Sequence, residues 1–296
     1  MSLTDPHPET RRQGEEQPVP ELSVSVVIPH FNSTDTIGRA LASIAAQTLL
    51  PLEVVVVDDC SAPEEREMLR GLEEETFPFR VRVLEQERNQ GPAAARNRGW
   101  EAAHGEWIAF LDSDDSWHPR RLELQARALT PATLMASTHS LVLSEDDPSP
   151  APLPARVPAP VRLGMGHHIV SNPHTTSSVL LRRDLPVRFT PGRFYAEDYE
   201  LWIRVAALGD VLSVPVPLAY FHKDPFGTSG LSSRIWKMIA GEQRTFVLLR
   251  RDGVLSLPQF LAAEVIMVAR IARRLALRAV RDLPGRLAGP RRPRSS

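Results

Sequence analysis

Cysteine is nearly absent from this chain, and Cys60 is the one cysteine among 296 residues. A single thiol excludes an internal disulfide and the zinc sites built from several cysteines, and it suits a reducing compartment. The sequence also lacks a run of about eighteen apolar residues, so we expect no membrane-spanning helix. No apolar segment follows a basic start, so we expect no secretory signal and a cytoplasmic location.

The sequence also has no excess of positive or negative charge. The 35 basic and 36 acidic residues leave a formal net charge of −1, which argues against a nucleic-acid partner for the chain as a whole. Hydrophobic residues make up 42% of the sequence, as in globular proteins. A chain of 296 residues is long enough to bury a sizeable core, in one large or two small domains.

Short apolar runs alternate with helix-like segments over the first part of the chain. Strands are expected at 22–28, 54–57, 79–84 and 106–111, and helices at 33–47, 63–75 and 92–103. Strands that are apolar throughout and alternate with helices predict an α/β fold, with a mostly parallel sheet covered by helices. The polar, proline-containing residues 1–21 are expected to be disordered.

The later part of the chain has a less regular pattern. We expect a proline-rich loop at 146–160, strands at 178–181 and 218–221, and helices at 197–208 and within 231–283. From residue 270 onward the sequence contains nine arginines and one acidic residue, Asp282. Such a basic helix fits two situations: packing on the domain with a solvated basic face, or lying on an anionic bilayer.

A cluster of carboxylates directly follows the strand expected at 106–111. Asp112, Asp114 and Asp115 are so close in sequence that they repel one another unless a cation neutralises them. Hard ions such as Mg²⁺ take one or two carboxylates together with substrate phosphates. A solvated turn that caps the next helix is the alternative. Because ligands of parallel sheets bind at the carboxyl ends of the strands, and Asp58 ends another strand, a ligand site is favoured.

Five segments carry a resemblance to a known family. They are VSVVIPHFN at 24–32, EVVVVDDCS at 53–61, NQGPAAARNRG at 89–99, FLDSDDSW at 110–117 and AEDYELWIRVAALG at 196–209. In order and spacing they resemble the motifs of the family 2 inverting glycosyltransferases. The resemblance implies the GT-A fold of nucleotide-diphospho-sugar transferases over residues 22–230, followed by C-terminal helices with a basic tail over 231–296.

The resemblance implies a donor site that includes Pro29, Phe31, Asp58, Arg96, Asp112 and Asp115. Pro29 and Phe31 would flank the base, Asp58 would accept a hydrogen bond from the uracil N3–H, and Arg96 would contact base or phosphate. From the residues alone, Asp58 fits a helix cap, Phe31 fits core packing and Arg96 fits a surface ion pair. Cys60 stands where the family usually has glycine.

The resemblance also implies a divalent metal, Mg²⁺ or Mn²⁺. Asp112 would bridge the ribose and the metal, Asp114 would ligate the metal directly, and Asp115 would support the loop or lie near the donor sugar. The segment around His222 departs from the family's Arg-x-His pattern, which leaves the role of His222 open.

Glu197 and Asp198 open the helix expected at 197–208. Carboxylates in a first helical turn are stabilised by the helix dipole, so an ordinary charged turn explains them structurally. The resemblance implies instead that Asp198, or as a second choice Glu197, is the general base that activates the acceptor hydroxyl. Direct displacement by that hydroxyl inverts the anomeric configuration.

Together these features imply a metal-dependent inverting glycosyltransferase. It would move a sugar from a nucleotide-sugar donor, most readily a UDP-sugar, to a hydroxyl of a glycan or lipid-linked acceptor in cell-surface polysaccharide or glycoconjugate synthesis. The basic helix adds a peripheral contact with the inner face of the plasma membrane. A non-catalytic sugar-nucleotide-binding or scaffold protein is the alternative; it would be expected to have lost one of the acids at 112, 114 or 198.

Overall fold

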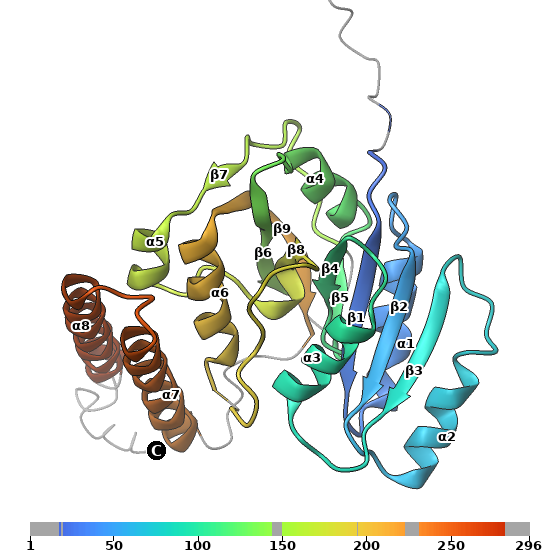
Figure 1. The fold of residues 1–296 in the computed structure, drawn as a ribbon, viewed down its shortest axis with the longest axis horizontal. Coiled ribbons are helices and arrows are strands. Elements are labelled where there is room, and N and C mark those ends of the chain that lie inside the picture. The colour runs from blue at the N-terminus through green and yellow to red at the C-terminus, as the bar shows by residue number, and fades with distance from the viewer. Residues whose placement is uncertain (1–17, 19, 144–149, 194, 223–230, 282–296) are drawn as a thin grey trace, which may run out of the picture.

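A nine-stranded sheet forms the centre of the computed structural model (Figure 1). The structure describes residues 18, 20–143, 150–193, 195–222 and 231–281. The strands follow the order β3-β2-β1-β4-β8-β6-β9-β5, and β7 pairs with β9 beside this path. The expected disorder of 1–21 concerns residues that lie almost entirely outside the described ranges. The expected loop at 146–160 is described only over 150–160, where it contains no helix or strand.

The first half of the sheet is parallel, as the sequence predicts. It contains β1 (Val24–His30), β2 (Glu53–Asp58), β3 (Arg80–Glu85) and β4 (Trp107–Phe110), connected by α1 (Thr34–Ala45), α2 (Pro63–Gly71) and α3 (Pro92–Ala102). β1 continues past the expected stop at Pro29. The pairing of β1 with β4 ends at Val27, so Pro29 has a neighbouring strand on one side only, where a missing N–H is tolerated.

The second half of the sheet adds antiparallel pairs. Its strands are β5 (Asp115–Trp117), β6 (Thr133–Val142), β7 (Val161–Arg162), β8 (Val179–Arg182) and β9 (Asp210–Phe221). β8 pairs antiparallel with both β4 and β6, whereas β6 and β9 run parallel over nearly their whole length. The expected α/β fold class is confirmed, while β5, β6 and β7 are strands that the sequence pattern did not reveal.

Two apolar clusters cover the two faces of the sheet. On one face α1 contributes Ile37, Leu41 and Ile44. On the other face Trp100 of α3 packs edge-on against Phe110 of β4. α3 comes very close to β1 because residue 99 is glycine: a Cβ there would lie 2.3 Å from Cγ1 of Val27. This close packing sets α3 beside the end of β4, which leads into the acidic loop.

The remaining helices are α4 (Arg121–Ala128), α5 (Met165–Val170), α6 (Glu197–Leu208), α7 (Leu231–Arg251) and α8 (Leu257–Arg281). α7 and α8 lie together at one end of the molecule, next to α5 and α6 (Figure 1). Tyr199 and Ile203 of α6 share a buried cluster with Phe246 and Leu249 of α7 and Ala263 of α8. In the described part of the chain, no helix combines the length and the apolar character needed to cross a membrane.

Candidate functional site

A cavity of about 500 Å³ opens at the carboxyl ends of β1, β2 and β4, and we call it the acid cleft. It is lined by Pro29, His30, Phe31, Asp59, Asn89, Gly91, Pro92, Ala95, Arg96, Asp112, Ser113 and Asp114. Five residues that the sequence singled out for donor or metal binding therefore meet at one site. Phe31 is 49% exposed, so core packing does not explain it.

Asp58 differs from its expected placement. It is the last residue of β2, its side chain is fully buried, and it does not line the acid cleft. Its Oδ2 accepts a hydrogen bond from the Ser61 backbone N–H at 3.1 Å and lies 3.4 Å from Nε of Arg66. Asp58 is also no helix cap, because α2 is preceded by Ala62 and has no side-chain cap. Its carboxylate stabilises the turn after β2 instead.

Asp59 takes the place at the cleft wall that the sequence assigned to Asp58. Its Oδ1 accepts hydrogen bonds from Nε2 of Gln86 and from the Gln90 backbone N–H, and its Oδ2 accepts one from the Gly91 N–H at 2.7 Å. Gly91 adopts φ 85°, a conformation that favours glycine. Consecutive residues along a strand point in opposite directions, so only one of two adjacent aspartates faces the ligand edge.

Three hydrogen bonds hold the acidic loop between β4 and β5. The Arg39 guanidinium donates a hydrogen bond to the Asp114 carbonyl at 2.7 Å. Ser33 occupies the N-cap position of α1 without a side-chain capping hydrogen bond, and its hydroxyl lies 2.8 Å from that of Ser113. Ser177 accepts a hydrogen bond from the Asp112 N–H. A loop tied down at three points is not the freely solvated turn that the sequence left open.

Asp115 belongs to β5 rather than to the loop, and it does not line the acid cleft. Its buried carboxylate accepts a hydrogen bond from the Ser177 hydroxyl at 2.5 Å. Burial, together with the negative charges of Asp112 and Asp114, raises the pKa of Asp115 to about 8. The carboxyl group therefore supports the loop from behind, which is one of the two roles expected for it.

Arg96 connects the acid cleft to the start of α6. Its side chain is only 6% exposed, with Nη2 at 2.7 Å from Asp112 Oδ1 and Nη1 at 3.4 Å from Glu197 Oε1. Burial alone would lower the pKa of Arg96, but the neighbouring carboxylates of Asp112 and Glu197 raise it. This buried, permanently charged bridge is not a surface ion pair.

Asp198 faces a second cavity, of about 380 Å³, that we call the base pocket. The pocket is lined by Ser171, Asn172, Ala196, Asp198, Tyr199, Met238, Ile239, Glu242 and Arg270. Burial, with a contribution from the Glu197 charge, raises the pKa of Asp198 to about 6. Glu197 itself is turned toward Arg96. The two neighbouring acids are thus separated into an ion-paired residue and a residue that faces a pocket.

The backbone just before these acids is strained. Ala196 adopts φ 57°, the left-handed conformation that non-glycine residues rarely take. Such conformations persist only where surrounding contacts hold them, and they cluster at functional sites. The Ala196 carbonyl accepts a hydrogen bond from the Thr245 hydroxyl of α7 at 3.3 Å.

The acid cleft offers a donor set that fits a hard divalent cation. In the described ranges no three His, Cys, Asp or Glu side chains gather into a complete metal site. Asp112 and Asp114 nevertheless supply two carboxylates at one cavity, and two carboxylates with substrate phosphates are the usual Mg²⁺ arrangement. The pKa of Asp115 is raised mainly by burial, and in smaller part by the negative charges of Asp112 and Asp114. His222 lies nearby, with Nε2 at 2.7 Å from the Ser116 hydroxyl.

Comparison with known proteins identifies related sequences. The model of the family described as glycosyl transferase family 2 matches residues 25–184. The succinoglycan biosynthesis protein ExoO of Rhizobium meliloti is 48% identical over 99 residues, covering 33% of this chain and 27% of that protein. The Escherichia coli WfgD, a UDP-Glc:alpha-D-GlcNAc-diphosphoundecaprenol beta-1,3-glucosyltransferase, is 28% identical over 184 residues, covering 62% of this chain and 69% of WfgD.

A solved structure supports the same fold. The mannosyltransferase PcManGT of Pyrobaculum calidifontis, in complex with GDP-Man and Mn²⁺, superimposes with a TM-score of 0.60. It is 17% identical, and the match covers 90% of this chain and 79% of PcManGT. At this identity the likeness shows the fold alone. Matches to the first three curated relatives span between 27% and 50% of their length.

Proposed function

The chain belongs to the glycosyl transferase family 2, and we propose that it is a metal-dependent, inverting enzyme of cell-surface polysaccharide or glycoconjugate synthesis. Its class as a glycosyltransferase follows from the family and from the named relatives. The single observation that carries the mechanism is the Arg96 bridge. It joins the carboxylates of the acid cleft to the helix start that presents Asp198.

The acid cleft is the proposed donor site. Pro29 and Phe31 would pack against the nucleotide base, and Asp59 lines the same cleft. Asp112 and Asp114 would hold a divalent cation together with the donor diphosphate. When bound, that cation supplies Lewis-acid stabilisation of the negative charge on the leaving nucleotide. The Arg96 guanidinium donates a hydrogen bond to Asp112 Oδ1 at 2.7 Å and so fixes the position of that carboxylate.

Asp198 is the proposed general base. With a pKa of about 6 it is mostly ionised at neutral pH, yet basic enough to accept a proton. The acceptor hydroxyl would give its proton to the Asp198 carboxylate while its oxygen bonds to the anomeric carbon. The bond from that carbon to the diphosphate oxygen breaks, and the electron pair leaves with the nucleotide. Attack opposite to the leaving group inverts the configuration.

The donor and acceptor classes rest on the relatives' names. WfgD is named for UDP-Glc and a diphosphoundecaprenol-linked acceptor, and PcManGT binds GDP-Man. We assign a UDP-sugar as donor and a glycan or lipid-linked hydroxyl as acceptor. Residues 22–230 would form the catalytic unit. The C-terminal helices would complete the acceptor side, because Glu242 of α7 and Arg270 of α8 line the base pocket.

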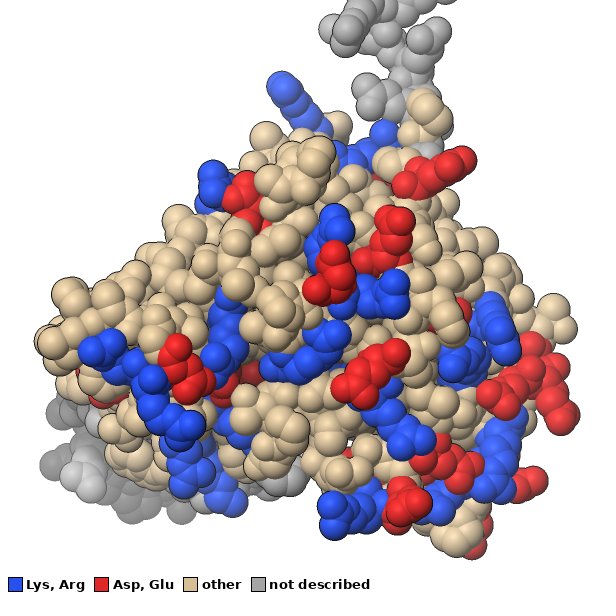
Figure 2. Space-filling model, viewed as in Figure 1, with Lys and Arg blue, Asp and Glu red and all other residues tan. Residues whose placement is uncertain are grey.

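A peripheral membrane contact fits such an acceptor. Four residues of α8 are exposed apolar side chains: Leu257 at 53%, Leu261 at 53%, Val265 at 69% and Val268 at 60%. Their spacing of four, four and three residues places them on one helix face. Figure 2 shows more basic than acidic side chains over α7 and α8. An apolar stripe flanked by basic residues is typical of a helix that lies on an anionic bilayer.

A donor screen tests the function. Purified protein is incubated with a panel of sugar nucleotides and Mn²⁺ or Mg²⁺, and donor hydrolysis is measured. Asp114→Ala is expected to abolish nearly all of it, whereas Asp35→Ala, which removes an exposed carboxylate from the first turn of α1, is expected to leave it unchanged. Equal rates in wild type and Asp114→Ala, or no hydrolysis of any donor, would contradict the proposal.

A further inference from the structure

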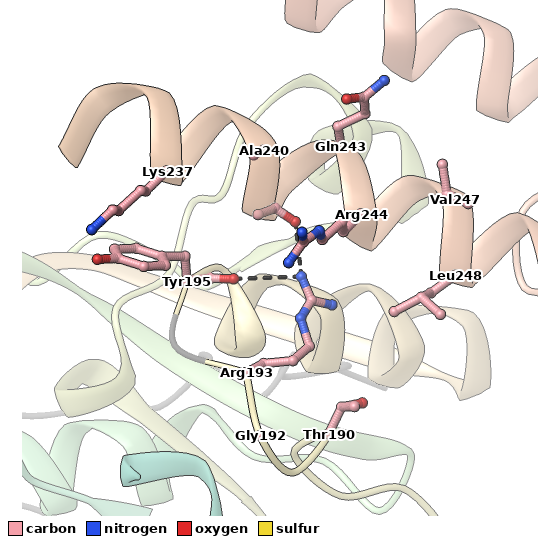
Figure 3. A pocket seen from close by; sticks show the side chains of 11 residues that line it. Thr190, Gly192, Arg193, Tyr195, Lys237, Ala240, Gln243, Arg244, Val247 and Leu248 are labelled. Carbon is pink, nitrogen blue, oxygen red and sulfur yellow. Dashed lines mark hydrogen bonds between the residues drawn. The ribbon is translucent and has the colours of Figure 1, made fainter. Parts of the chain in front are cut away.

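A third cavity, of about 730 Å³, lies between residues 190–193 with Tyr195 on one side and one face of α7 on the other, and we call it the cationic pocket (Figure 3). It is larger than the acid cleft and the base pocket. Its lining contains Arg193, Lys237 and Arg244 and no acidic residue. The proposed mechanism makes no use of it.

Two positive charges in this pocket have no ion-pair partner among the described residues. Arg193 forms an ion pair with Glu200 and donates hydrogen bonds to the Gly241 carbonyl at 2.8 Å and to the Thr245 hydroxyl at 2.9 Å. The second oxygen of Glu200 is already paired with Arg204. Within the described part of the chain, Lys237 and Arg244 form no ion pair.

Lys237 and Arg244 are seven residues apart on α7, so they project from the same helix face about two turns apart. In Figure 3 the Lys237 ammonium lies beside the Tyr195 ring, and Arg244 points toward Arg193 at the middle of the pocket. Two separated cations in one cavity match a diphosphate or two phosphate oxygens better than they match a single small anion.

The opposite end of the pocket is apolar. Val247 and Leu248 line it, away from Lys237 (Figure 3). An inorganic phosphate or a sugar acid would gain nothing from these side chains, whereas the chain of a phosphorylated lipid would bury against them. The cavity also has much more volume than a phosphate group alone fills. The lining therefore fits an amphiphile with an anionic phosphate end.

The cationic pocket adjoins the segment that carries the proposed base. Tyr195 lines this pocket, and Ala196, the next residue, lines the base pocket. α7 is in direct backbone contact with the segment, since a Cβ at Gly241 would lie 2.8 Å from the Tyr195 carbonyl oxygen. A ligand that occupies the cationic pocket therefore lies against the segment that leads to Asp198.

We propose that the cationic pocket binds the phosphate end of a phosphorylated amphiphilic acceptor, with Lys237 and Arg244 as the phosphate ligands. The proposal rests on the proposed function, because it takes the ligand to be the acceptor of the same transfer. It adds that the phosphate of a lipid-linked acceptor is recognised, and it names the residues that bind it. Phosphate binding at Lys237 and Arg244 would leave the sugar end of the acceptor free to reach Asp198.

The test is a binding measurement with farnesyl diphosphate, below its aggregation concentration and in EDTA, so that no divalent ion holds the probe at the acid cleft. Isothermal titration compares wild type with the Lys237→Ala/Arg244→Ala variant. The matched control, Arg80→Ala/Arg98→Ala, removes two exposed positive charges from β3 and α3, which do not line this pocket. The loss of two charge-assisted hydrogen bonds is expected to weaken binding roughly tenfold or more. The control is expected to bind like wild type.

Three results would overturn the proposal. Equal affinity of wild type and the Lys237→Ala/Arg244→Ala variant for farnesyl diphosphate would show that these two residues do not bind the phosphate. Equal affinity for inorganic diphosphate would show that the apolar end contributes nothing, and equal affinity for farnesol would show that the phosphate contributes nothing. Circular dichroism checks that the variants are folded. Donor hydrolysis by wild type with Mn²⁺ is measured separately, so failure of the glycosyltransferase function and failure of this pocket assignment are distinguished.

Discussion

At the residue scale, two adjacent acids have been given different environments by one arginine. Glu197 is turned toward Arg96 and remains an ion-pair partner, while Asp198 faces the base pocket, where Glu242 and Arg270 are the other charged groups. Burial and the Glu197 charge raise the pKa of Asp198, and Arg96 opposes that shift. Separation of two carboxylates by their surroundings is a common way to divide structural and acid–base roles.

The pKa of Asp198 makes a prediction about the pH dependence of activity. The base form is the carboxylate, so the rate of donor hydrolysis should be level above pH 6 and should fall about tenfold per pH unit well below it. Asp198→Asn should reduce the rate about 10²–10⁴-fold and abolish this acid limb. Asp184→Asn, an exposed acid paired with Arg182, should change neither. A rate that stays level down to pH 4.5, or an acid limb that persists in Asp198→Asn, would contradict the role of Asp198.

Much of the site was predictable from the sequence at this scale, because its residues directly follow strands. Pro29, Phe31, Asp112 and Asp114 meet at one cleft for that reason. Asp58 was expected at the donor nucleotide, whereas its neighbour Asp59 lines the cleft. Which of two neighbours faces the ligand depends on where the strand ends, and the sequence does not define that end to a single residue.

At the element scale, α7 contacts the segment before Asp198, the proposed base, from outside the sheet. The Arg193 and Thr245 side chains connect residues 193–196 to α7, and Gly241 allows the two backbones to touch. These contacts join residues more than forty positions apart in sequence. They also hold Ala196 in its left-handed conformation, at the point where α6 begins with Glu197.

Gly241→Ala tests this positioning. The added methyl group would lie 2.8 Å from the Tyr195 Cβ and carbonyl oxygen, so α7 or the segment before Asp198 has to move. We expect kcat for donor hydrolysis to fall severalfold with the donor KM unchanged, since the acid cleft is not touched. Gly38→Ala is the matched control, because its new methyl group meets nothing within 4 Å in the middle of α1. That control should keep wild-type activity and gain up to about 1 kcal/mol of stability. Equal kcat in both variants would contradict the positioning role of α7.

The sequence pattern predicts some strands and misses others, and the difference has a physical reason. β1, β2 and β4 are short, largely apolar and buried on both faces, which gives a clear pattern, whereas β3 alternates valine with charged residues and is only partly buried. β6 mixes small and polar residues and pairs with β9 through register shifts, so neither an apolar run nor a regular alternation marks it. The walls of the base pocket on α7 and α8 come from distant parts of the chain, and only the folded structure brings them to Asp198.

At the scale of the whole molecule, the proposed donor, base and acceptor-phosphate sites lie in three separate pockets. The acid cleft lies at the parallel half of the sheet, while the base pocket and the cationic pocket both involve α7. The exposed apolar stripe of α8 lies on the same helical end of the molecule (Figure 1). A lipid-linked acceptor at a bilayer surface would therefore approach the enzyme from the side on which its proposed phosphate and hydroxyl sites lie.

This arrangement predicts that α8 contributes to membrane binding. The triple variant Leu261→Ser/Val265→Ser/Val268→Ser should sediment with phosphatidylglycerol vesicles much less than wild type, because burial of each such side chain contributes roughly 1–3 kcal/mol. The matched control is Leu52→Ser/Met68→Ser/Leu208→Ser, which removes three apolar side chains that are about half exposed or more but lie away from α8. It should sediment like wild type. Vesicles of phosphatidylcholine should bind the wild type more weakly, since the basic residues find no anionic partner there. Equal sedimentation of the two triple variants would show that this helix face does not contact the membrane.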